Sequence, residues 1–493
     1  MAGFTFFYLA LRGSRVDGPV HFATVRNFTG LMLALSLAGC TVGPDYEPPP
    51  LPVPEQWSAA PADAHGDADL ELSKWWGRFG DPQLTDLVAR AARGNLDLRI
   101  AEARVIEARA LRGIASSRLW PEIDAAGRAS ATAGAAAPGF GGQSSLFLAA
   151  LEAFWEIDVF GGVRRSVEAA EADVDASLDT RRAVLLDLIG SVAVTYVEMR
   201  GLQGRIAAVR GNLAAQEETR ELTEAQRNVG LASDLDVERA RALVAATAAE
   251  LPPLETALSA NIHRLGVLLG EPPAALNSEL SRPAPIPSAP REVVAGVPTD
   301  LLRRRPDLGR AERELAAATA RIGEATADLY PRFTLTGSVG LRSEDVKDLL
   351  QGRYNFAAIG PNIIWPLFAA GRIMANIDAQ NARQQQALAR YEQTLLLALE
   401  DVETALVRYA REQIRRSALR AAVDANREAA VLARRLHANG LIEFLDVLVA
   451  ERSLLESEDR LVTSETAVSS SLVTLYVALG GGWEAAEAVE LGI

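Results

Sequence analysis

Apolar residues at helical spacing run through much of the chain. In the first half, successive apolar positions advance by three or four residues, a period of about 3.5 that is typical of helices packed as coiled coils. These positions are Leu185, Leu188, Val192, Tyr196, Met199, Leu202, Ile206, Val209 and Leu213. The pattern predicts one very long helix over about 163–228, and a matching helix is expected over about 372–438.

An alternating pattern marks a second kind of element. Apolar and small polar residues take turns along 332–341, where the apolar set is Phe333, Leu335, Val339 and Leu341. This period of two predicts a strand with one polar face. Three further strands are expected over about 122–134, 144–157 and 354–365. The two strands in the first half are rich in Ala and Gly, so their prediction depends mainly on an internal repeat.

The chain contains one unit written twice, at a constant offset of 210 residues. Asp97-Leu98 matches Asp307-Leu308, and the register continues without a gap to Gly270 and Gly480. Other pairs at this offset are Gly113/Gly323, Pro121/Pro331, Trp155/Trp365, Gly161/Gly371 and Gly230/Gly440. A constant register over a whole half indicates duplication.

Each copy predicts the same order of elements. In the first copy, a helix over about 94–119 ends before Pro121 and leads to two strands and the long helix; the second copy has this helix at about 305–329. A Gly-Leu turn at 230–231 then starts a return helix of about 36 residues that ends at Gly270. The long helix measures about 100 Å at 1.5 Å per residue. We expect a rod in which two shorter helices lie beside a long one without a globular core, which explains an aromatic content of only 6%.

The start of the chain has the pattern of a lipoprotein signal. A short apolar stretch, Leu31–Ala38, follows Arg26 and ends in Leu37-Ala38-Gly39-Cys40, which is similar to a lipobox. Position favours a lipidated Cys40 over the alternative, a buried apolar cysteine. Diacylglycerol and palmitate on Cys40 are therefore the one covalent cofactor expected. Translation is expected to begin near Val25, because a second apolar block makes the leader unusually long.

Composition and charge exclude several classes of function. The net charge of −14 argues against a nucleic-acid partner, since phosphates are repelled. The four histidines, of which His21 lies in the leader, are far apart and lack metal-ligand spacing. Neither a nucleophile elbow nor a phosphate-binding loop is present, so no enzyme is expected. The scattered helix acids, such as Glu400, Asp401 and Glu403, are interpreted as a solvated face.

The strands together with the expected anchor predict a membrane assembly. After the leader there is no uninterrupted apolar run of 18 or more residues, because Asp187 interrupts the best candidate at 184–199. Open sheet edges cannot lie in lipid, and four strands cannot close a membrane barrel, which needs about eight. Several chains must therefore share one wall, and this argument by itself allows two to four copies.

Five segments carry a family resemblance: CTVGPDYEPP after the leader, and the stretches 75–105, 297–333, 440–455 and 476–483. With them the chain resembles the outer-membrane efflux proteins of the TolC/OprM type, the NodT-like outer membrane factor lipoproteins of RND efflux systems. The resemblance covers nearly all of the chain after Cys40. Thr41 in place of Asp after the cysteine implies export to the outer membrane, as in similar bacterial lipoproteins.

The resemblance implies a mainly helical fold with a small β part. It implies a homotrimer with a twelve-stranded transmembrane β-barrel and a twelve-helix periplasmic tube. The implied function is a passive exit duct for small molecules such as drugs and toxic compounds, served by a periplasmic membrane-fusion adaptor and an inner-membrane RND-type transporter. The expected organisation is a signal region (1–39), a lipidated tether and equatorial segment (40–93), a first repeat (94–270), a Pro-rich equatorial linker (271–304), a second repeat (305–480) and an equatorial tail (481–493).

The resemblance also implies where the function lies. In the family, the helix–helix turns at the periplasmic tip meet the adaptor, and the matching positions here are Val229, Gly230, Leu231, Ala232, Asn439, Gly440 and Leu441. The alternative is that both glycines only end helices.

For the gate, the family places a hydrophobic ring residue at Leu445, which this chain retains. Four residues later the family commonly has Asp, but this chain has Val449, so the existence of a second acidic ring is open. We hypothesise that Leu445 and Val449 form an apolar constriction that closes by dewetting. Asp446, like Asp234 and Asp236, either presents a carboxylate to the lumen or caps a helix N-terminus.

Two rival interpretations remain at this level. One is export of metal ions or proteins through the same fold. The other is a periplasmic coiled-coil scaffold lipoprotein, in which the expected strands are only loops.

Overall fold

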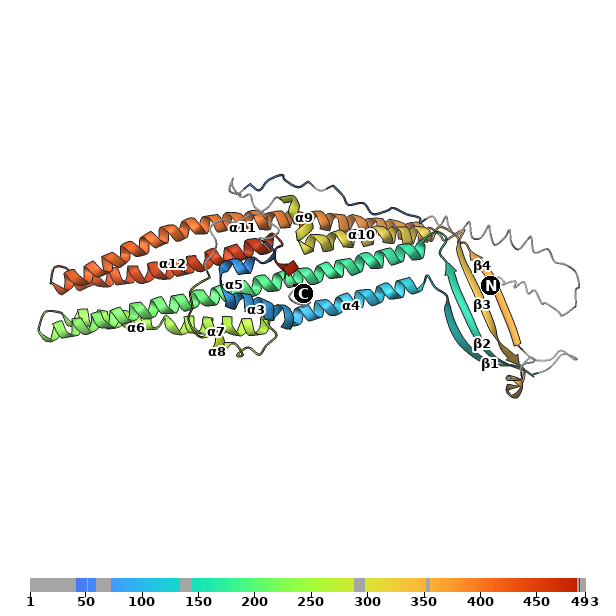
Figure 1. Cartoon of the computed structure of the whole chain (residues 1–493), viewed down its shortest axis with the longest axis horizontal. Helices are drawn as coiled ribbons and strands as arrows, with labels where there is room; N and C mark the ends of the chain where they lie inside the picture. The colour runs from blue at the N-terminus through green and yellow to red at the C-terminus, as the bar shows by residue number, and fades with distance from the viewer. Residues whose placement is uncertain are drawn as a thin grey trace, which may run out of the picture. The chain divides into compact units, whose positions relative to one another are not determined.

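The computed structural model describes residues 41–50, 52–58, 72–133, 143–287, 298–351, 355–485 and 487. Cys40 and the leader lie outside the described residues. The chain divides into two compact units (Figure 1). The sheet unit comprises Met1–Gly43, Arg118–Arg165 and Gly323–Ile373. The helical unit comprises Pro44–Ser117, Ser166–Ile322 and Met374–Ile493.

The sheet unit holds four antiparallel strands in the order β1-β2-β3-β4. Their bounds are β1 (Glu122–Ala133), β2 (Gln143–Ile157), β3 (Arg332–Ser343) and β4 (Asn355–Ile364). Each repeat contributes one neighbouring pair, and β2 pairs with β3 to join the two. The sequence predicted all four strands to within a few residues, so the prediction of loops in their place is wrong.

The helices follow the predicted order in both repeats. Their bounds are η1 (Trp75–Phe79), α3 (Pro82–Gly94), α4 (Leu96–Ser117), α5 (Gly162–Asn228), α6 (Asp234–Ala248), α7 (Leu251–Leu268), α8 (Asn277–Leu280), η2 (Pro298–Asp300), α9 (Leu301–Arg304), α10 (Pro306–Ala327), η3 (Val346–Asp348), α11 (Arg372–Ala438) and α12 (Phe444–Ala478). Helices α5 and α11 each have 67 residues and lie at the 210-residue offset. The fold is mainly helical with a small antiparallel sheet, as the sequence predicted.

The return helix of the first repeat is not continuous, and this part of the prediction is wrong. It consists of α6 and α7, separated at Ala249 and Glu250. Pro252 and Pro253 explain the break, since neither ring nitrogen can donate the hydrogen bond that a helix interior requires. The second repeat has no proline there, and α12 runs unbroken for 35 residues.

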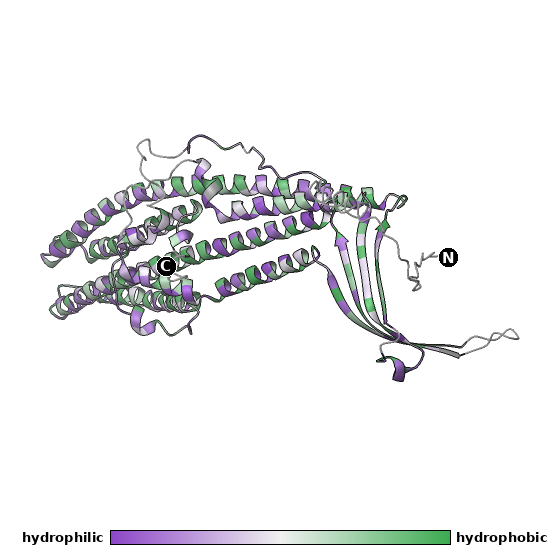
Figure 2. Cartoon of the chain, turned by 45° about the vertical axis from the view of Figure 1, so that its right-hand side comes forward, coloured by the Kyte–Doolittle hydropathy of each residue, from purple (hydrophilic) through white to green (hydrophobic). Residues whose placement is uncertain are grey.

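Helix α12 is also the one described helix that is long and apolar enough to cross a membrane. Half of its most apolar window is buried inside the protein. Its hydrophobicity therefore serves packing between helices. Hydrophilic and hydrophobic residues are interspersed along the long helices (Figure 2).

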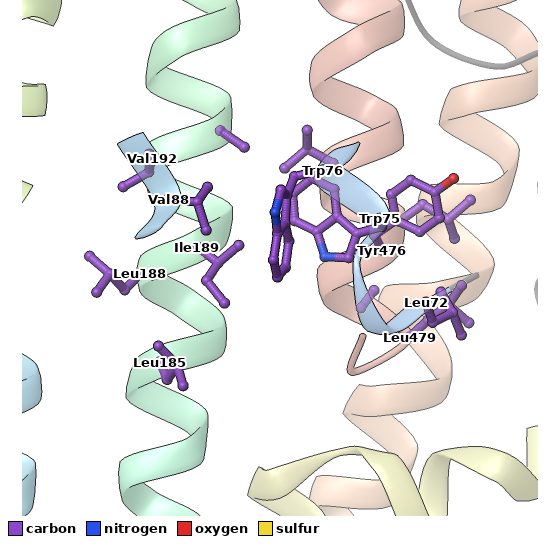
Figure 3. Close-up of a cluster of buried hydrophobic side chains, with 14 of the residues drawn as sticks. Leu72, Trp75, Trp76, Val88, Leu185, Leu188, Ile189, Val192, Tyr476 and Leu479 are labelled. Atoms are coloured by element: carbon purple, nitrogen blue, oxygen red, sulfur yellow. The ribbon is translucent and has the colours of Figure 1, made fainter. Parts of the chain in front are cut away.

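The helical unit contains a substantial aromatic core, so the expectation of a rod without a core is wrong. Trp75 stacks on Tyr476 with ring centroids 5.3 Å apart, and its indole N–H donates to the carbonyl of Gly481 at 3.0 Å. Leucine, isoleucine and valine side chains of α5 lie beside this pair (Figure 3). Several aromatic residues of the helical unit gather here, where segments outside the repeats pack against the long helices.

A buried arginine ties two of these segments to α5. Arg200 donates to the hydroxyl of Tyr196 at 3.0 Å, to the carbonyl of Arg282 at 2.9 Å and to the side chain of Gln83. Tyr196 in turn donates to Asp81 at 2.8 Å. Burial, reinforced by that bond, raises the pKa of Tyr196 to about 12. Residues from the three segments expected to form the equatorial belt therefore lie together against the long helices.

Candidate functional site

The turns that end the two long helices have the same backbone structure. Gly230 and Gly440 have φ of 78° and 69°, in the left-handed region that favours glycine. The N–H of Leu231 donates to the carbonyl of Gln226 at 2.8 Å, and the N–H of Leu441 donates to the carbonyl of Leu436 at 3.0 Å. These bonds define a Schellman motif, so both glycines do end helices.

The same turns also present apolar side chains to solvent. Val229, Leu231 and Leu441 are each more than two-thirds exposed, and Leu231 reaches 79%. Ala232 is half-buried, while Asn439 is exposed and its side chain donates to the carbonyl of Arg435 at 2.7 Å. Exposed apolar side chains do not stabilise a turn, so ending a helix does not explain them.

The predicted gate residues lie on the first turns of α12. Leu445 and Val449 are four residues apart, so they share one face of the helix, and they are 46% and 57% exposed. Phe444 and Val447 are buried on another face, where they pack with Ala433 of α11. The structure therefore presents Leu445 and Val449 together on the outside of the folded chain.

The three tip carboxylates have different surroundings. Asp236 forms a capping box with Ser233, and the bond from the Ser233 hydroxyl at 2.6 Å lowers the pKa of Asp236. Asp234 pairs with Arg227 at 2.8 Å across the first turn. Asp446 is exposed in the first turn of α12. Pairing thus accounts for Asp234 and capping for Asp236, whereas Asp446 is an exposed carboxylate on the first turn of α12.

One face of the sheet carries all the charge of the four strands. Directly paired residues point to the same face, and Asp124, Glu152, Ser338 and Ala358 form one such row across the sheet. Every charged strand residue belongs to this face: Glu122, Asp124, Arg128, Glu152, Glu156, Arg332 and Arg342.

The opposite face of the sheet is apolar and exposed. Its larger residues include Ile123, Leu151, Trp155, Leu335, Val339, Ile359 and Ile363. Ile359 is 79% exposed. In the described residues, β1 and β4 are edge strands with one side unpaired. A sheet of this kind leaves both an apolar face and two edges without partners.

The residues that follow Cys40 are held firmly in the sheet unit. The N–H of Val42 donates to the carbonyl of Phe160 at 3.1 Å, and Arg165 donates to the carbonyl of Val42 at 3.2 Å. A Cβ on Gly161 would lie 2.4 Å from a methyl group of Thr41. The first described residues therefore start at the base of the strands, one residue from the predicted lipidation site.

Two of the acids expected on a solvated face, Glu400 and Asp401, are exposed and also line a cavity of about 470 Å³. Its lining includes Asp187, Glu400 and Asp401, with Arg305 and Asp307. Arg305 donates to both oxygens of Asp307, at 3.0 and 2.7 Å, and to Asp401 at 3.2 Å. Burial favours the neutral carboxyl, but Arg305 outweighs it and holds the pKa of Asp307 below its usual value.

The sequence analysis missed a buried carboxylate on α12. Glu451 is only 3% exposed and lies between α5 and α11. The spacing of the buried residues contained the signal, because Phe444, Val447, Glu451 and Leu454 advance by three or four residues along one face. Glu451 occupies one of the apolar positions of this pattern, which by itself predicts a buried carboxylate.

The described residues contain no group of three or more His, Cys, Asp or Glu side chains that could hold a metal ion. His263 and His437 are the described histidines, while His21 and His65 lie outside the described residues.

Comparison with known proteins identifies related chains. Residues 87–271 and 297–481 each match the family model described as outer membrane efflux protein. The chain is 32% identical over 463 residues to the nodulation protein T of Rhizobium leguminosarum bv. trifolii, with 92% of this chain and 97% of that protein covered.

Two further similarities extend over most of the chain. The toluene efflux pump outer membrane protein TtgF of Pseudomonas putida is 32% identical over 474 residues, with 93% of this chain and 97% of that protein covered. The solved structure of the outer-membrane channel OprN has a TM-score of 0.86 at 36% identity, covering 90% of this chain and 100% of that chain.

Proposed function

Because the chain belongs to the outer membrane efflux protein family, we propose that three copies of it form a passive exit duct for small molecules. The protein is an outer-membrane efflux channel component, and its family and structural neighbours are channel proteins. The proposal adds the trimer, a periplasmic membrane-fusion adaptor and an energised RND-type transporter of the inner membrane. Energy comes from the transporter, so the duct itself needs no catalytic step.

The observation that carries the proposal is the two-faced sheet with open edges. An apolar exposed face is suited to lipid, and a charged face is suited to a water-filled lumen. Unpaired edges cannot remain in lipid, because each unsatisfied backbone group there costs several kcal/mol. Three copies supply twelve strands and leave no edge.

The helical unit offers a second surface for neighbouring copies. Apolar side chains of α4 are more than half exposed, namely Leu96, Ile100, Ile106, Leu111 and Ile114. Helix α11 exposes Leu396, Leu397 and Ile414 to a similar extent. Several exposed apolar side chains on one helix often mark an interface between proteins, which supports contact between α4 of one copy and α11 of the next.

The tips and the lipid anchor complete the proposed duct. The exposed apolar residues of the two turns support adaptor docking at Val229, Leu231 and Leu441. Leu445 and Val449 share an exposed helix face, which supports an apolar gate when three copies meet. Hydrogen bonds fix Val42 to Phe160 and Arg165 in the sheet unit. Because Cys40 is two residues before Val42, these bonds support an acyl chain on Cys40 at the membrane surface.

Paired arginine substitutions on neighbouring strand positions test the duct. Ile359 lies on the apolar face and Ala358 on the charged face of β4. Ile359→Arg should prevent membrane assembly, because arginine in the middle of the bilayer costs about 2–4 kcal/mol. Ala358→Arg should still give a heat-modifiable trimer in outer-membrane fractions, with altered ion selectivity in planar bilayers. Equal tolerance of both changes, with a soluble rod after delipidation, would support the scaffold and refute the duct.

The proposal names the class of transported compound, small molecules, and no particular substrate. The relatives are named for nodulation and for toluene efflux, although they resemble this chain equally well. A wide water-filled duct discriminates poorly among small molecules, so the transporter sets the substrate.

A further inference from the structure

Glu451 lies on the part of α12 that carries the proposed gate. It comes two residues after Val449, and its side chain is buried while those of Leu445 and Val449 are exposed. Two residues correspond to about 200° around a helix, so Glu451 points away from the gate face. A change at Glu451 therefore acts on the position of this helix turn and not on the lumen directly.

The carboxyl group of Glu451 has partners on two different helices. The hydroxyl of Thr219 on α5 lies 3.0 Å from Oε1. A guanidinium nitrogen of Arg434 on α11 lies 3.7 Å from Oε1, which is within ion-pair range and too long for a hydrogen bond. The other oxygen, Oε2, is buried and has no hydrogen-bond partner among the described residues.

Counting hydrogens shows that the ionised carboxylate is poorly satisfied here. The Thr219 hydroxyl lies 2.9 Å from the carbonyl of Ala215 as well as 3.0 Å from Glu451. It has one hydrogen, so it can donate to one of these two acceptors. If Glu451 carries a proton on Oε1, its O–H donates to Thr219 while Thr219 donates to Ala215, so both hydroxyl hydrogens have an acceptor. If Glu451 is ionised, it needs a closer approach of Arg434.

A cavity beside Glu451 provides room for that approach. The cavity has a volume of about 430 Å³ and is lined by small residues of α5, among them Gly211 and Ala215. Gln216 of α5 is 97% buried, and both polar atoms of its amide lack partners in the described structure. The ionisable groups lining the cavity are Arg427 and Arg434 of α11 and Glu451 and Glu458 of α12. Unsatisfied buried groups around a void mark a loosely held contact.

We propose that Glu451 is a positioning residue for the gate: its carboxyl group joins α12 to Thr219 of α5 when protonated and to Arg434 of α11 when ionised. This inference rests on the proposed function, because the gate is part of the duct. Exchange of partner moves the first turns of α12, and Leu445 and Val449 move with them. Burial, opposed by Arg434, raises the pKa of Glu451 above its ordinary value.

The experiment measures single-channel conductance of the full-length protein in planar bilayers between pH 5 and pH 8. The wild type should change conductance with pH, and Glu451→Gln should keep the acid value throughout, because its amide can still donate to Thr219. Thr219→Val removes the partner of the neutral form and should move the midpoint to lower pH. Arg434→Gln removes the partner of the ionised form and should move it to higher pH. These opposite shifts distinguish partner exchange from a merely structural role.

Glu458→Gln is the matched control, since Glu458 faces the same cavity and is bonded to Asn212 at 2.7 Å and Arg427 at 2.8 Å. It should leave the pH profile of the wild type unchanged. A Glu451→Gln profile that still follows the wild type overturns the inference, and so does a loss of pH dependence in Glu458→Gln. Leu445→Ser distinguishes failure of this inference from failure of the proposed function. If Leu445→Ser raises the conductance but Glu451→Gln does not change the pH profile, the inference about Glu451 is wrong and the proposed duct is still supported.

A second readout does not depend on conductance. The infrared carbonyl band of a protonated carboxyl group should appear on acidification, vanish in Glu451→Gln and shift in Thr219→Val. If no band can be assigned to Glu451, the proposed exchange of its partners Thr219 and Arg434 is wrong, even if the channel conducts. Presence of the band in a protein that forms no channel refutes the proposed function, and the role at the gate with it.

Discussion

The indole N–H of Trp155 donates to the backbone carbonyl of Leu119 at 3.0 Å. Trp365, 210 residues later, makes the same bond to the carbonyl of Leu329, also at 3.0 Å. Each carbonyl lies just beyond the helix that precedes the strands, where the chain has left the helix and no N–H four residues later pairs with it. The end of the helix therefore leaves an acceptor, and the repeated tryptophan satisfies it.

Trp155→Phe keeps the aromatic volume and removes this bond. We expect a loss of about 1 kcal/mol in unfolding free energy, the usual net value of one hydrogen bond. Thermal unfolding of the purified protein in detergent, followed by circular dichroism, measures the change. Trp120→Phe is the control, because Trp120 is 74% exposed in the same unit. Equal stability of Trp155→Phe and the wild type would show that water replaces the indole.

The apolar gate predicts that Leu445→Ser raises single-channel conductance. A hydroxyl group at the constriction favours water where the leucine side chain excludes it. Leu235→Ser is the matched control, since Leu235 holds the same position in the first repeat and is 57% exposed. An unchanged conductance for Leu445→Ser, or the same rise for both variants, would remove Leu445 from the gate.

Docking at the tips predicts that Leu441→Asp weakens binding of the periplasmic adaptor. Burial of one leucine side chain contributes about 2 kcal/mol, so the charged variant should lose more than tenfold in affinity at each tip. Co-purification of the crosslinked adaptor with the channel measures the loss. Leu350→Asp is the control, because Leu350 is 86% exposed in the sheet unit. Full adaptor recovery with Leu441→Asp would contradict docking at this turn.

The Arg305–Asp307 pair predicts an acid-dependent stability. Because the pKa of Asp307 is lowered in the folded chain, the ionised pair stabilises the fold above the usual pKa of a carboxyl group. That contribution disappears as the pH falls through the folded value. Asp307→Asn should therefore cost about 1–2 kcal/mol at pH 7 and progressively less as the pH falls below the usual pKa of a carboxyl group.

Urea unfolding at several pH values measures this difference. Asp97→Asn is the control, because Asp97 is the repeat counterpart of Asp307 and is exposed. The pair does not contribute as described if Asp307→Asn loses the same free energy at every pH.

Lipidation predicts that Cys40→Ser abolishes labelling of the protein by radioactive palmitate. The chain has no other cysteine, so no second thiol can take up the label. Thr41→Ala, next to the modified residue, should be labelled like the wild type. Retained palmitate in Cys40→Ser would place the lipid elsewhere.

Much of the fold was predictable because the spacing of apolar residues along short stretches of the sequence indicates each helix and strand. The spacing of Leu185, Leu188 and Val192 predicted α5, and the alternation around Leu335 predicted β3. The constant offset transferred these predictions to weaker stretches, including the Ala-rich β1. The repeat failed at α6 and α7, where Pro252 breaks a helix that its counterpart continues.

The candidate site was predictable in part. The tip turns at Gly230 and Gly440 lie where the Gly-Leu pattern placed them, and α12 begins just before Leu445. Whether these residues dock an adaptor or close a gate stays a prediction. Helix capping, one of the two alternatives that the sequence left for Asp236, is confirmed. The pairing of Asp307 with Arg305 could not be predicted, because it depends on which side chains the fold brings within hydrogen-bond reach.

The sequence by itself determined the duplication, the long helices, the four strands and the family, because periodicity and register are properties of neighbouring residues. Only the tertiary structure decided that Trp75 stacks on Tyr476, and that Glu451 lies between Thr219 and Arg434. Such contacts depend on how far each helix is rotated and shifted against its neighbours. A single chain's pattern shows which face of a helix is apolar, but it leaves that rotation and shift unspecified.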